Sequence, residues 1–333
     1  MLFFDSLEDV PTDFGPSCVT LGKFDGVHLG HRAVITALTE AATARSLTSV
    51  AITFDRNPLT VIDPERRPLA LVSAAQRREL LEQTGLDVMV ELAFDEKFSR
   101  KTPEEFIEGV LVGVLRAQLV LVGPDARFGV NGSGTFDTLV EHGRALGFDV
   151  MRLDPRLADH DRPASSTLIR QMLGEGDVRG AGAVLGRNPL VRSVVVHGQK
   201  RGRALGYPTA NLDPALEGFV PADGVYAGYL TVVTGTGSSG TGSGTGSGGG
   251  SGRIERGERM PAAISVGNNP TFEGVPEKQV EAFVLDRILD LYDRVVEVEF
   301  VERVRGMAKF DSLNELIDQM ADDTQKVRGI LRA

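Results

Sequence analysis

The stretch Val19-Thr-Leu-Gly-Lys-Phe-Asp-Gly-Val-His-Leu-Gly-His31 joins an apolar run, predicted to be a buried strand, to a helical pattern. Gly22 and Gly26 interrupt the run, and His28 and His31 are three residues apart, so one helical turn places both imidazoles on the same face. Unpaired backbone N–H groups at a helix start favour an anion, and glycines let the backbone approach it closely. The pattern predicts a site for a nucleoside triphosphate. The alternative is a surface helix that begins with two histidines.

Composition and charge narrow the class of protein. The 333 residues suggest roughly two domains, each able to bury its own core. The formal net charge of −10 argues against broad nucleic-acid binding, which depends on lysine and arginine. Cys18 is the only cysteine, so no intrachain disulfide or cysteine zinc cluster is expected, and its place beside a predicted strand suggests inert core. The acidic start lacks a secretory signal and no apolar run could span a bilayer, so we expect a cytoplasmic protein without a membrane partner.

The first half of the chain alternates strand-like and helix-like segments. Two capping boxes, at 73–76 and 102–105, open predicted helices that end near residues 84 and 115. Further apolar strands are predicted at 49–54, 87–92, 118–122 and 148–153. This alternation predicts a parallel, Rossmann-like α/β sheet that is covered on both faces and binds ligands at the carboxyl ends of its strands. The histidine turn, Asn57-Pro58 and 123–125 would lie there.

The second half contains expected strands separated by turn residues rather than alternating strands and helices. We therefore place the domain boundary near Gly186, giving domains at 1–186 and 187–333. Strands are predicted at 190–197, 224–233, 261–266, 279–285 and 294–304, several with period-two alternation. They indicate an antiparallel barrel or sandwich, closed by a helix that begins at Ser312. Its apolar stripe is predicted to comprise Leu313, Leu316, Ile317, Met320 and Val327.

The segment 235–252 contains only glycine, serine and threonine. Such a composition predicts a flexible loop, here an enlarged hairpin connection between two strands. It includes a formal G-x-G-x-x-G pattern at 235–240, but no helix follows, so a dinucleotide site is not expected.

Three further motifs could carry chemistry. Ser165-Ser-Thr-Leu-Ile-Arg170 is either a simple helix cap or a triphosphate contact. The segment Gly198–Asn211 combines glycines and cations that could hold phosphate with a hydroxyl and an amide that suit magnesium, although a basic surface loop has the same composition. Glu281, Phe283 and Leu285 are two residues apart and so share one face of their strand. This predicts that Glu281 points toward the packed side, either in a salt bridge or as a functional carboxylate.

Together these residues resemble the bacterial bifunctional riboflavin kinase/FAD synthetase family. The matching segments occur in the family's order over nearly the whole chain: 21–31, 165–170, 206–211, 222–226, 264–272 and 280–286. The resemblance implies a nucleotidylyltransferase-type α/β domain followed by a six-stranded riboflavin kinase barrel. It also implies two ATP-dependent steps, from riboflavin to FMN and from FMN to FAD, with Mg²⁺ as cofactor and flavin as substrate and product rather than as a redox group.

The resemblance implies roles for individual residues. Glu281, His28 and His31 would be catalytic, and Thr209 and Asn211 would bind Mg²⁺ with ATP. The other nucleotide-binding residues would be Gly22, Phe24, Asp25, Gly26, Ser166, Thr167, Arg170, Gly198, Arg201, Gly202 and Gly206. Flavin-binding residues would be Asn57, Asp125 and Phe128.

Two positions depart from the family pattern. Asn57 stands where the family commonly has histidine, and Ala126 where it commonly has an aromatic residue. Both lie in the adenylylation domain, so we expect slower or weaker FAD synthesis rather than none. The alternatives are an active kinase with a weakened adenylyltransferase and a flavin-binding module that has lost catalysis. Assembly into a homo-oligomer is left open by the sequence.

Overall fold

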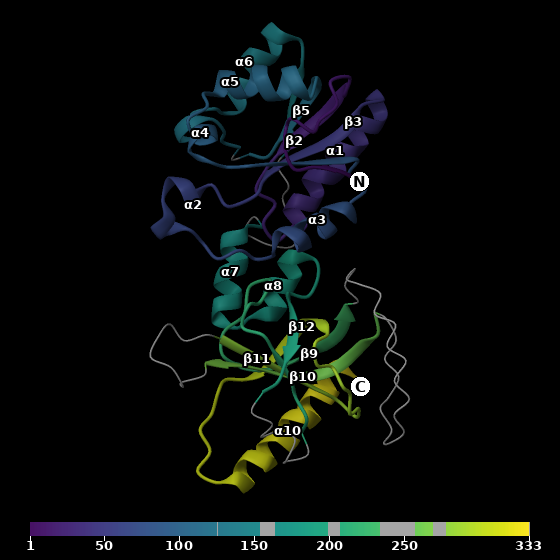
Figure 1. Ribbon diagram of the computed structural model, residues 1–333, viewed down its shortest axis with the longest axis vertical. Helices are drawn as coiled ribbons and strands as arrows, with labels where there is room; N and C mark the ends of the chain where they lie inside the picture. Colours follow the sequence, from purple (N-terminus) through teal and green to yellow (C-terminus); the bar gives the residue numbers. More distant parts are fainter. Residues whose placement is uncertain (125, 154–163, 199–206, 234–256, 269–277, 333) are drawn as a thin grey trace. The chain divides into compact units, whose positions relative to one another are not determined.

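The computed structural model describes the chain except residues 125, 154–163, 199–206, 234–256, 269–277 and 333 (Figure 1). The chain forms two compact units, Met1–Ser166 and Thr167–Ala333. This division lies inside helix α7 (Ser166–Glu175), whereas the sequence pattern changes from alternating strands and helices to successive strands near Gly186. Helix α7 is bonded to the second unit, since the backbone N–H of Ala222 donates to the carbonyl of Leu173 at 2.9 Å.

The first unit contains a six-stranded parallel sheet in the order β1-β4-β3-β2-β5-β6, which confirms the α/β prediction. Its strands are β1 (Leu2–Phe4), β2 (Ser17–Leu21), β3 (Thr48–Phe54), β4 (Val88–Leu92), β5 (Ala117–Val122) and β6 (Asp149–Arg152). Strand β1, at one edge, was not indicated by the sequence pattern because only three residues pair there.

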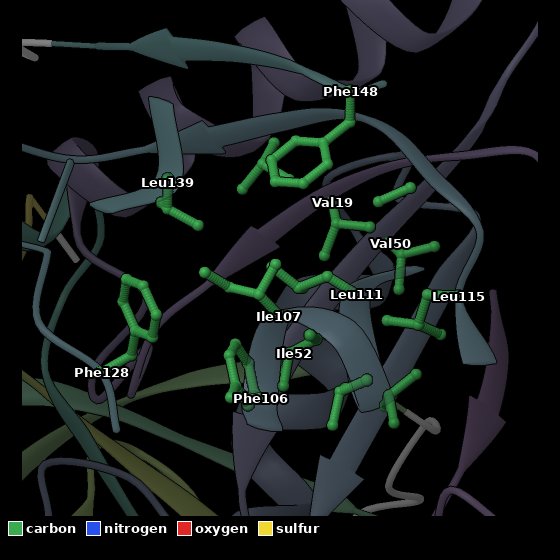
Figure 2. Packing of buried hydrophobic residues seen from close by; sticks show 14 of the residues in the cluster. Val19, Val50, Ile52, Phe106, Ile107, Leu111, Leu115, Phe128, Leu139 and Phe148 are labelled. Atoms are coloured by element: carbon green, nitrogen blue, oxygen red, sulfur yellow. The ribbon is translucent and has the colours of Figure 1, made fainter. Parts of the chain in front are cut away.

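The two faces of this sheet bury separate apolar clusters because successive side chains of a strand point to opposite faces. Val19 of β2 and Ile52 of β3 pack on one face against Ile107 and Leu111 (Figure 2). Cys18 packs on the other face with helix α1 (Leu29–Arg45). Burial raises the pKa of the Cys18 thiol to about 11, so it stays protonated, as an inert core residue should.

The helices of the first unit begin where the capping signals predict. Ser73 caps α3 (Ala74–Glu82), and Thr102 caps α5 (Pro103–Phe106), each in a reciprocal capping box. Helix α5 continues into a π-helical segment, η2 (Ile107–Val114), a change of pitch that the sequence did not indicate. The remaining helical segments are α2 (Leu59–Ile62), η1 (Pro64–Arg66), α4 (Glu96–Ser99), η3 (Val130–Gly132) and α6 (Phe136–Leu146).

The second unit is a closed six-stranded barrel in the order β10-β11-β8-β7-β12-β9, preceded by α7 and α8 (Val178–Leu185). The strands are β7 (Leu190–Val196), β8 (Ala210–Leu212), β9 (Gly224–Val233), β10 (Arg259–Asn268), β11 (Lys278–Val284) and β12 (Val295–Arg305). All pairs are antiparallel. Sequence pattern indicated five of these strands; the sixth, β8, is too short to show periodicity and closes the barrel between β11 and β7.

Helix α10 (Leu313–Leu331) packs against the barrel. Val327 is fully buried beside Ala227 and Leu285, but Leu313 is 57% exposed, so the predicted apolar stripe is wrong at its first position. Asp323 accepts three bonds of 2.7 to 3.0 Å from the Arg305 guanidinium and fixes the helix to β12.

The glycine-, serine- and threonine-rich segment 235–252 lies outside the described residues. The strands on either side of it pair antiparallel, with Arg259 opposite Thr231, as a hairpin connection requires. Among the residues that the structure describes, no helix is both long and apolar enough to span a bilayer.

Candidate active sites

The turn after β2 holds its backbone in an uncommon conformation. Phe24 and Val27 have φ angles of 47° and 39°, and Gly26 has 82°. Positive φ is unfavourable for a β-branched residue such as valine, yet both Phe24 and Val27 are buried, and their packing holds the turn. Gly22 completes it, because a Cβ there would lie 3.0 Å from the Phe24 ring. Such strain concentrates at functional sites, where it fixes backbone groups in place.

His28 and His31 stand together at the start of α1. Their rings stack with centroids 3.7 Å apart, as the three-residue spacing predicts. His28 is the N-cap, and its Nδ1 accepts a bond from the backbone N–H of His31 at 3.3 Å. Gly30 makes room for this arrangement, because a Cβ there would lie 3.2 Å from Cε1 and Nδ1 of His28. His28 thus caps the start of α1, and both imidazole rings lie beside this helix end.

The His31 ring is electrically neutral at physiological pH. Burial, and then the proximity of His28, hold the pKa of His31 well below its ordinary value of 6.5. Its Nδ1 is buried and has no hydrogen-bond partner among the described residues. A neutral imidazole offers one N–H donor and one acceptor, so an anionic oxygen beside the ring would supply the missing partner.

A cavity of about 640 Å³ opens beside this turn, a size typical of small-molecule sites. Its charged and titratable lining residues are Lys23, His28, His31, Lys101 and Arg127, and no carboxylate lines it among the described residues. The lining also includes six phenylalanines: Phe24, Phe54, Phe94, Phe98, Phe106 and Phe128. Although the chain carries a net charge of −10, this cavity is basic and aromatic, which suits a planar ligand that carries phosphate.

The other predicted residues of the first unit have varied surroundings. Asp25 accepts the backbone N–H of Leu71 at 2.9 Å, and its carbonyl accepts the Ser166 hydroxyl at 2.8 Å, so the end of the unit is tied to the turn. Asn57 accepts the backbone N–H of Leu59 at 3.0 Å and thereby orders the start of α2. Phe128 lines the cavity.

Three predicted positions cannot be placed in this site. Thr167 and Arg170 follow Ser166 on α7 and belong to the second unit. Asp125 lies outside the described residues.

The barrel carries a separate polar cluster on β8 and β11. Glu281 lies directly opposite Asn211 across the two strands. The Thr209 hydroxyl donates to Oε2 of Glu281 at 3.4 Å, and Nδ2 of Asn211 donates to the Thr209 carbonyl at 3.2 Å and to its hydroxyl at 3.4 Å. Gly198 lies against this cluster, since a Cβ there would be 2.5 Å from the Asn211 amide. The strand register therefore assembles a carboxylate, a hydroxyl and an amide.

Glu281 shares a face of β11 with Phe283, as the sequence pattern predicts, but this face lies outside the barrel. The fully buried side chains of β11 are Val280, Ala282 and Val284, so the barrel interior takes the alternate set. Glu281 and Phe283 are half-buried on the outer face, where Phe283 packs beside Tyr207. Phe283 and Leu285 pack in the cluster that contains Val327 of α10, so this face is packed as the pattern predicts, but against a helix rather than inside the barrel.

Partial burial has a chemical consequence for Glu281. It raises the pKa of the carboxyl above its ordinary value, while the hydrogen bond from Thr209 lowers it by a smaller amount. A carboxylate with a raised pKa is a stronger base when ionised.

The cluster supplies oxygen donors of the kind that Mg²⁺ prefers. With Nδ2 of Asn211 engaged by Thr209, Oδ1 is the end of the amide that can serve a cation, beside the Thr209 hydroxyl. The described residues contain no group of three or more histidine, cysteine or acidic side chains arranged to hold a metal. A magnesium ion here would therefore need most of its oxygens from water and nucleotide phosphates. The predicted nucleotide residues Arg201, Gly202 and Gly206 lie outside the described residues.

Sequence reasoning missed several residues of the first site. Lys101, Arg127 and four of the cavity's phenylalanines were not predicted as site residues: Phe54, Phe94, Phe98 and Phe106. The capping box at 102–105 and the glycines near residue 129 mark the two loops, but only the fold brings them together, through a bond from the Val130 N–H to the Lys101 carbonyl at 2.7 Å.

Two family models match the chain, one for each half. Residues 11–168 match the family described as FAD synthetase, and residues 185–331 match the family described as riboflavin kinase.

Whole proteins of known name are similar as well. A bifunctional riboflavin kinase/FMN adenylyltransferase of Escherichia coli K12 is 33% identical over 93% of this chain and 92% of its own length. One from Bacillus subtilis is 31% identical over 93% and 91%. A crystal structure named as a macrolide-efflux protein of Streptococcus pneumoniae matches with a TM-score of 0.82 and 30% identity, over 98% of each chain. The similarity thus covers both units rather than one motif.

Proposed function

The chain belongs to the bifunctional riboflavin kinase/FMN adenylyltransferase family, and we propose from that premise how its residues divide the two reactions. The protein is a flavin-nucleotide biosynthetic enzyme with riboflavin kinase and FMN adenylyltransferase activities, and ATP and flavins are its substrates. We assign the adenylyltransferase to residues 1–186 and the kinase to residues 187–333.

In the kinase half, Glu281 is the proposed general base. The terminal hydroxyl of riboflavin is a neutral alcohol and a weak nucleophile, so its attack on the γ-phosphate of ATP needs a proton acceptor. Glu281 has the raised pKa and the half-exposed position that such a base requires. The observation that carries this assignment is the contact of Glu281 with Thr209, next to Asn211.

Thr209 and Asn211 are the proposed ligands of magnesium-bound ATP. Magnesium bound there would neutralise charge on the phosphates during transfer. The two side chains would orient the nucleotide so that its γ-phosphate faces the hydroxyl that Glu281 deprotonates. Gly198 would approach the phosphates through its backbone N–H group, and the family motif assigns Arg201, Gly202 and Gly206 to the nucleotide as well.

In the adenylyltransferase half, the histidine turn is the proposed ATP site. The phosphate of FMN is already mostly ionised near neutral pH, since its second pKa is about 6, so attack on the α-phosphate needs no general base. The site must instead align the two phosphates and stabilise charge. His28 and His31 stand at a helix start beside a basic cavity, where they can donate to phosphate oxygens.

The remaining family positions receive their proposed roles from the motif. Gly22, Phe24, Asp25 and Gly26 shape the turn, and the family motif assigns Ser166, Thr167 and Arg170 to the triphosphate. Phe128 would contact flavin from the cavity wall, and the family motif assigns the same role to Asp125. Asn57 and Ala126 depart from the family, and because Ala126 lines the same cavity we expect weaker FAD synthesis.

A time course with separated substrates tests these assignments. The purified protein is incubated with riboflavin, ATP and Mg²⁺, and riboflavin, FMN and FAD are resolved by chromatography; a parallel reaction begins from FMN. Conversion through FMN to FAD is expected. Accumulation of FMN without FAD would leave an active kinase with a weakened adenylyltransferase, and no conversion of either flavin would leave a flavin-binding module.

A further inference from the structure

A buried ion pair lies just behind the cavity wall of the first unit. Nη2 of Arg77, on α3, is 2.7 Å from Oε1 of Glu91, on β4, and the two side chains are only 11% and 12% exposed. Neither residue lines the cavity, and neither belongs to a motif that the family assignments use. Their burial nevertheless shows that both charges are held in a fixed place.

The Arg77 guanidinium reaches the ends of two other strands. Its Nη2 also donates to the carbonyl of Phe54, the last residue of β3, at 2.7 Å. Its Nη1 donates to the carbonyl of Lys23, two residues beyond β2, at 3.4 Å, and the Thr53 hydroxyl donates to the same carbonyl at 3.3 Å. One side chain thus connects the carboxyl ends of the neighbouring strands β2, β3 and β4.

The two carbonyls belong to two different parts of the cavity lining, the histidine turn and the aromatic residues. Lys23 lies in the strained turn that leads to His28, whereas the Phe54 ring packs against Phe94 and Phe98 in the aromatic lining. Lys23 and Phe54 both line the cavity, and their carbonyls accept bonds from Arg77. A change at Arg77 would therefore move both walls without removing any group that touches a ligand.

We propose that Arg77, held in place by Glu91, is a positioning residue for adenylyl transfer, which sets the separation between the histidine turn and the aromatic wall. The inference rests on the proposed function of the first unit. Its chemical basis is the planar guanidinium, which donates in several fixed directions at once, whereas the lysine ammonium cannot reproduce that fork. Alignment of reacting groups is sensitive to small shifts, since a misplacement of about 1 Å can lower a rate about 100-fold.

The test compares steady-state FMN adenylylation and riboflavin phosphorylation in the full-length protein. Three variants are used: Arg77→Lys, which keeps the charge, the double variant Arg77→Met/Glu91→Gln, which leaves no lone buried charge, and Arg78→Met as a control. Arg78 is the next residue on the same helix and is exposed. Its guanidinium carbon lies 3.3 Å from the centroid of the Phe3 ring, away from the residues that Arg77 contacts.

The double variant is expected to lower kcat for FAD synthesis about 10- to 100-fold. The KM for ATP should change less than threefold, and riboflavin phosphorylation should stay within twofold of the parent. Arg77→Lys should lie between the double variant and the parent, and Arg78→Met should match the parent. Rates are measured at least 15 °C below each variant's own unfolding midpoint, so that a purely stabilising role would leave kcat unchanged.

Several results would overturn the inference. A parental kcat in the double variant, a parental kcat in Arg77→Lys, or an equal loss of both activities would show that the pair only stabilises the fold. Absence of FAD synthesis in the parent protein itself would remove the proposed function and this inference with it. Parental rates in the variants of an active enzyme would remove the inference alone.

Discussion

The two units build their sites in different ways. In the first, the histidine turn, the aromatic wall and the basic residues come from loops at the carboxyl ends of parallel strands, and they enclose a cavity. In the second, Glu281 and Asn211 face each other across two paired strands, on the outer face of a closed barrel. A loop site depends on backbone conformation and on distant supports, whereas a site on paired strands depends on register, which the barrel fixes.

This difference determines which substitutions should separate the two activities. A conservative change of a strand side chain leaves the barrel intact and removes only its chemistry. A change in the turn alters chemistry and local conformation together, so matched variants are needed to distinguish them.

The largest effect is expected for Glu281→Gln. The amide has the same shape and can still accept from Thr209, but it cannot take a proton from riboflavin. Since general base catalysis contributes about 10²- to 10⁴-fold, kcat for riboflavin phosphorylation should fall by that factor. FMN adenylylation by the same preparation is the control and should be unchanged; a kinase that keeps more than a third of its rate would exclude Glu281 as the base.

At the turn, His28→Ala and His28→Asn separate chemistry from capping. Alanine removes both the imidazole and the N-cap, at a cost of about 0.5–2 kcal/mol in stability, whereas asparagine is a favoured N-cap. Both should lower FMN adenylylation about 10²- to 10³-fold, the loss typical for a group that stabilises transition-state charge. Measured urea unfolding should show the loss of stability in the alanine variant only. Normal FAD synthesis by His28→Asn would mean that His28 serves the helix and not the reaction.

Two glycine-to-alanine changes give a smaller effect and compare the units directly. In Gly198→Ala the new Cβ would lie 2.5 Å from the Asn211 amide, and in Gly30→Ala it would lie 3.2 Å from the His28 ring. The tighter contact forces the larger displacement of the neighbouring side chain. We therefore expect the phosphorylation rate to fall about 10- to 30-fold in Gly198→Ala. The adenylylation rate should fall about 3- to 10-fold in Gly30→Ala. Each variant should keep the other activity, and a loss of both in either one would contradict two independent sites.

The smallest effect is a displacement of the pH profile. A general base acts only when it is ionised, so phosphorylation should decline about tenfold per pH unit below the pKa of Glu281, which burial raises. Thr209→Val removes both a proposed magnesium ligand and the bond that lowers this pKa, so kcat should fall and the acid limb of the remaining kcat/KM profile should move to higher pH, while adenylylation keeps its own profile. An unmoved limb would assign it to another group.

The same shift affects stability with a defined sign. Folding raises the Glu281 pKa and so favours its neutral form. The contribution to stability is therefore fully present below the ordinary pKa of 4.5 and is lost as pH rises through the raised pKa. Acid should consequently stabilise this position of the barrel even as it stops the kinase.

Local patterns were sufficient for the elements that carry strong signals. The turn after Val19 could be predicted because glycines, histidines and a helix start are adjacent in the chain, and Ser73 and Thr102 cap helices through residues three positions away. Strand β8 escaped prediction because three residues show no periodicity. The pattern predicts a packed face for Glu281, but it could not show that this face packs against α10, far along the chain, rather than inside the barrel.

The sequence by itself determined the two fold classes, the family and the order of the motifs, since alternation of strands, capping and motif spacing are properties of neighbouring residues. Only the tertiary structure decided that the aromatic and basic residues share one cavity, that Glu281 lies outside the barrel, and that Arg77 joins three strand ends. The physical reason is that these arrangements depend on contacts between residues far apart in the chain, which packing and strand register create and no local pattern encodes.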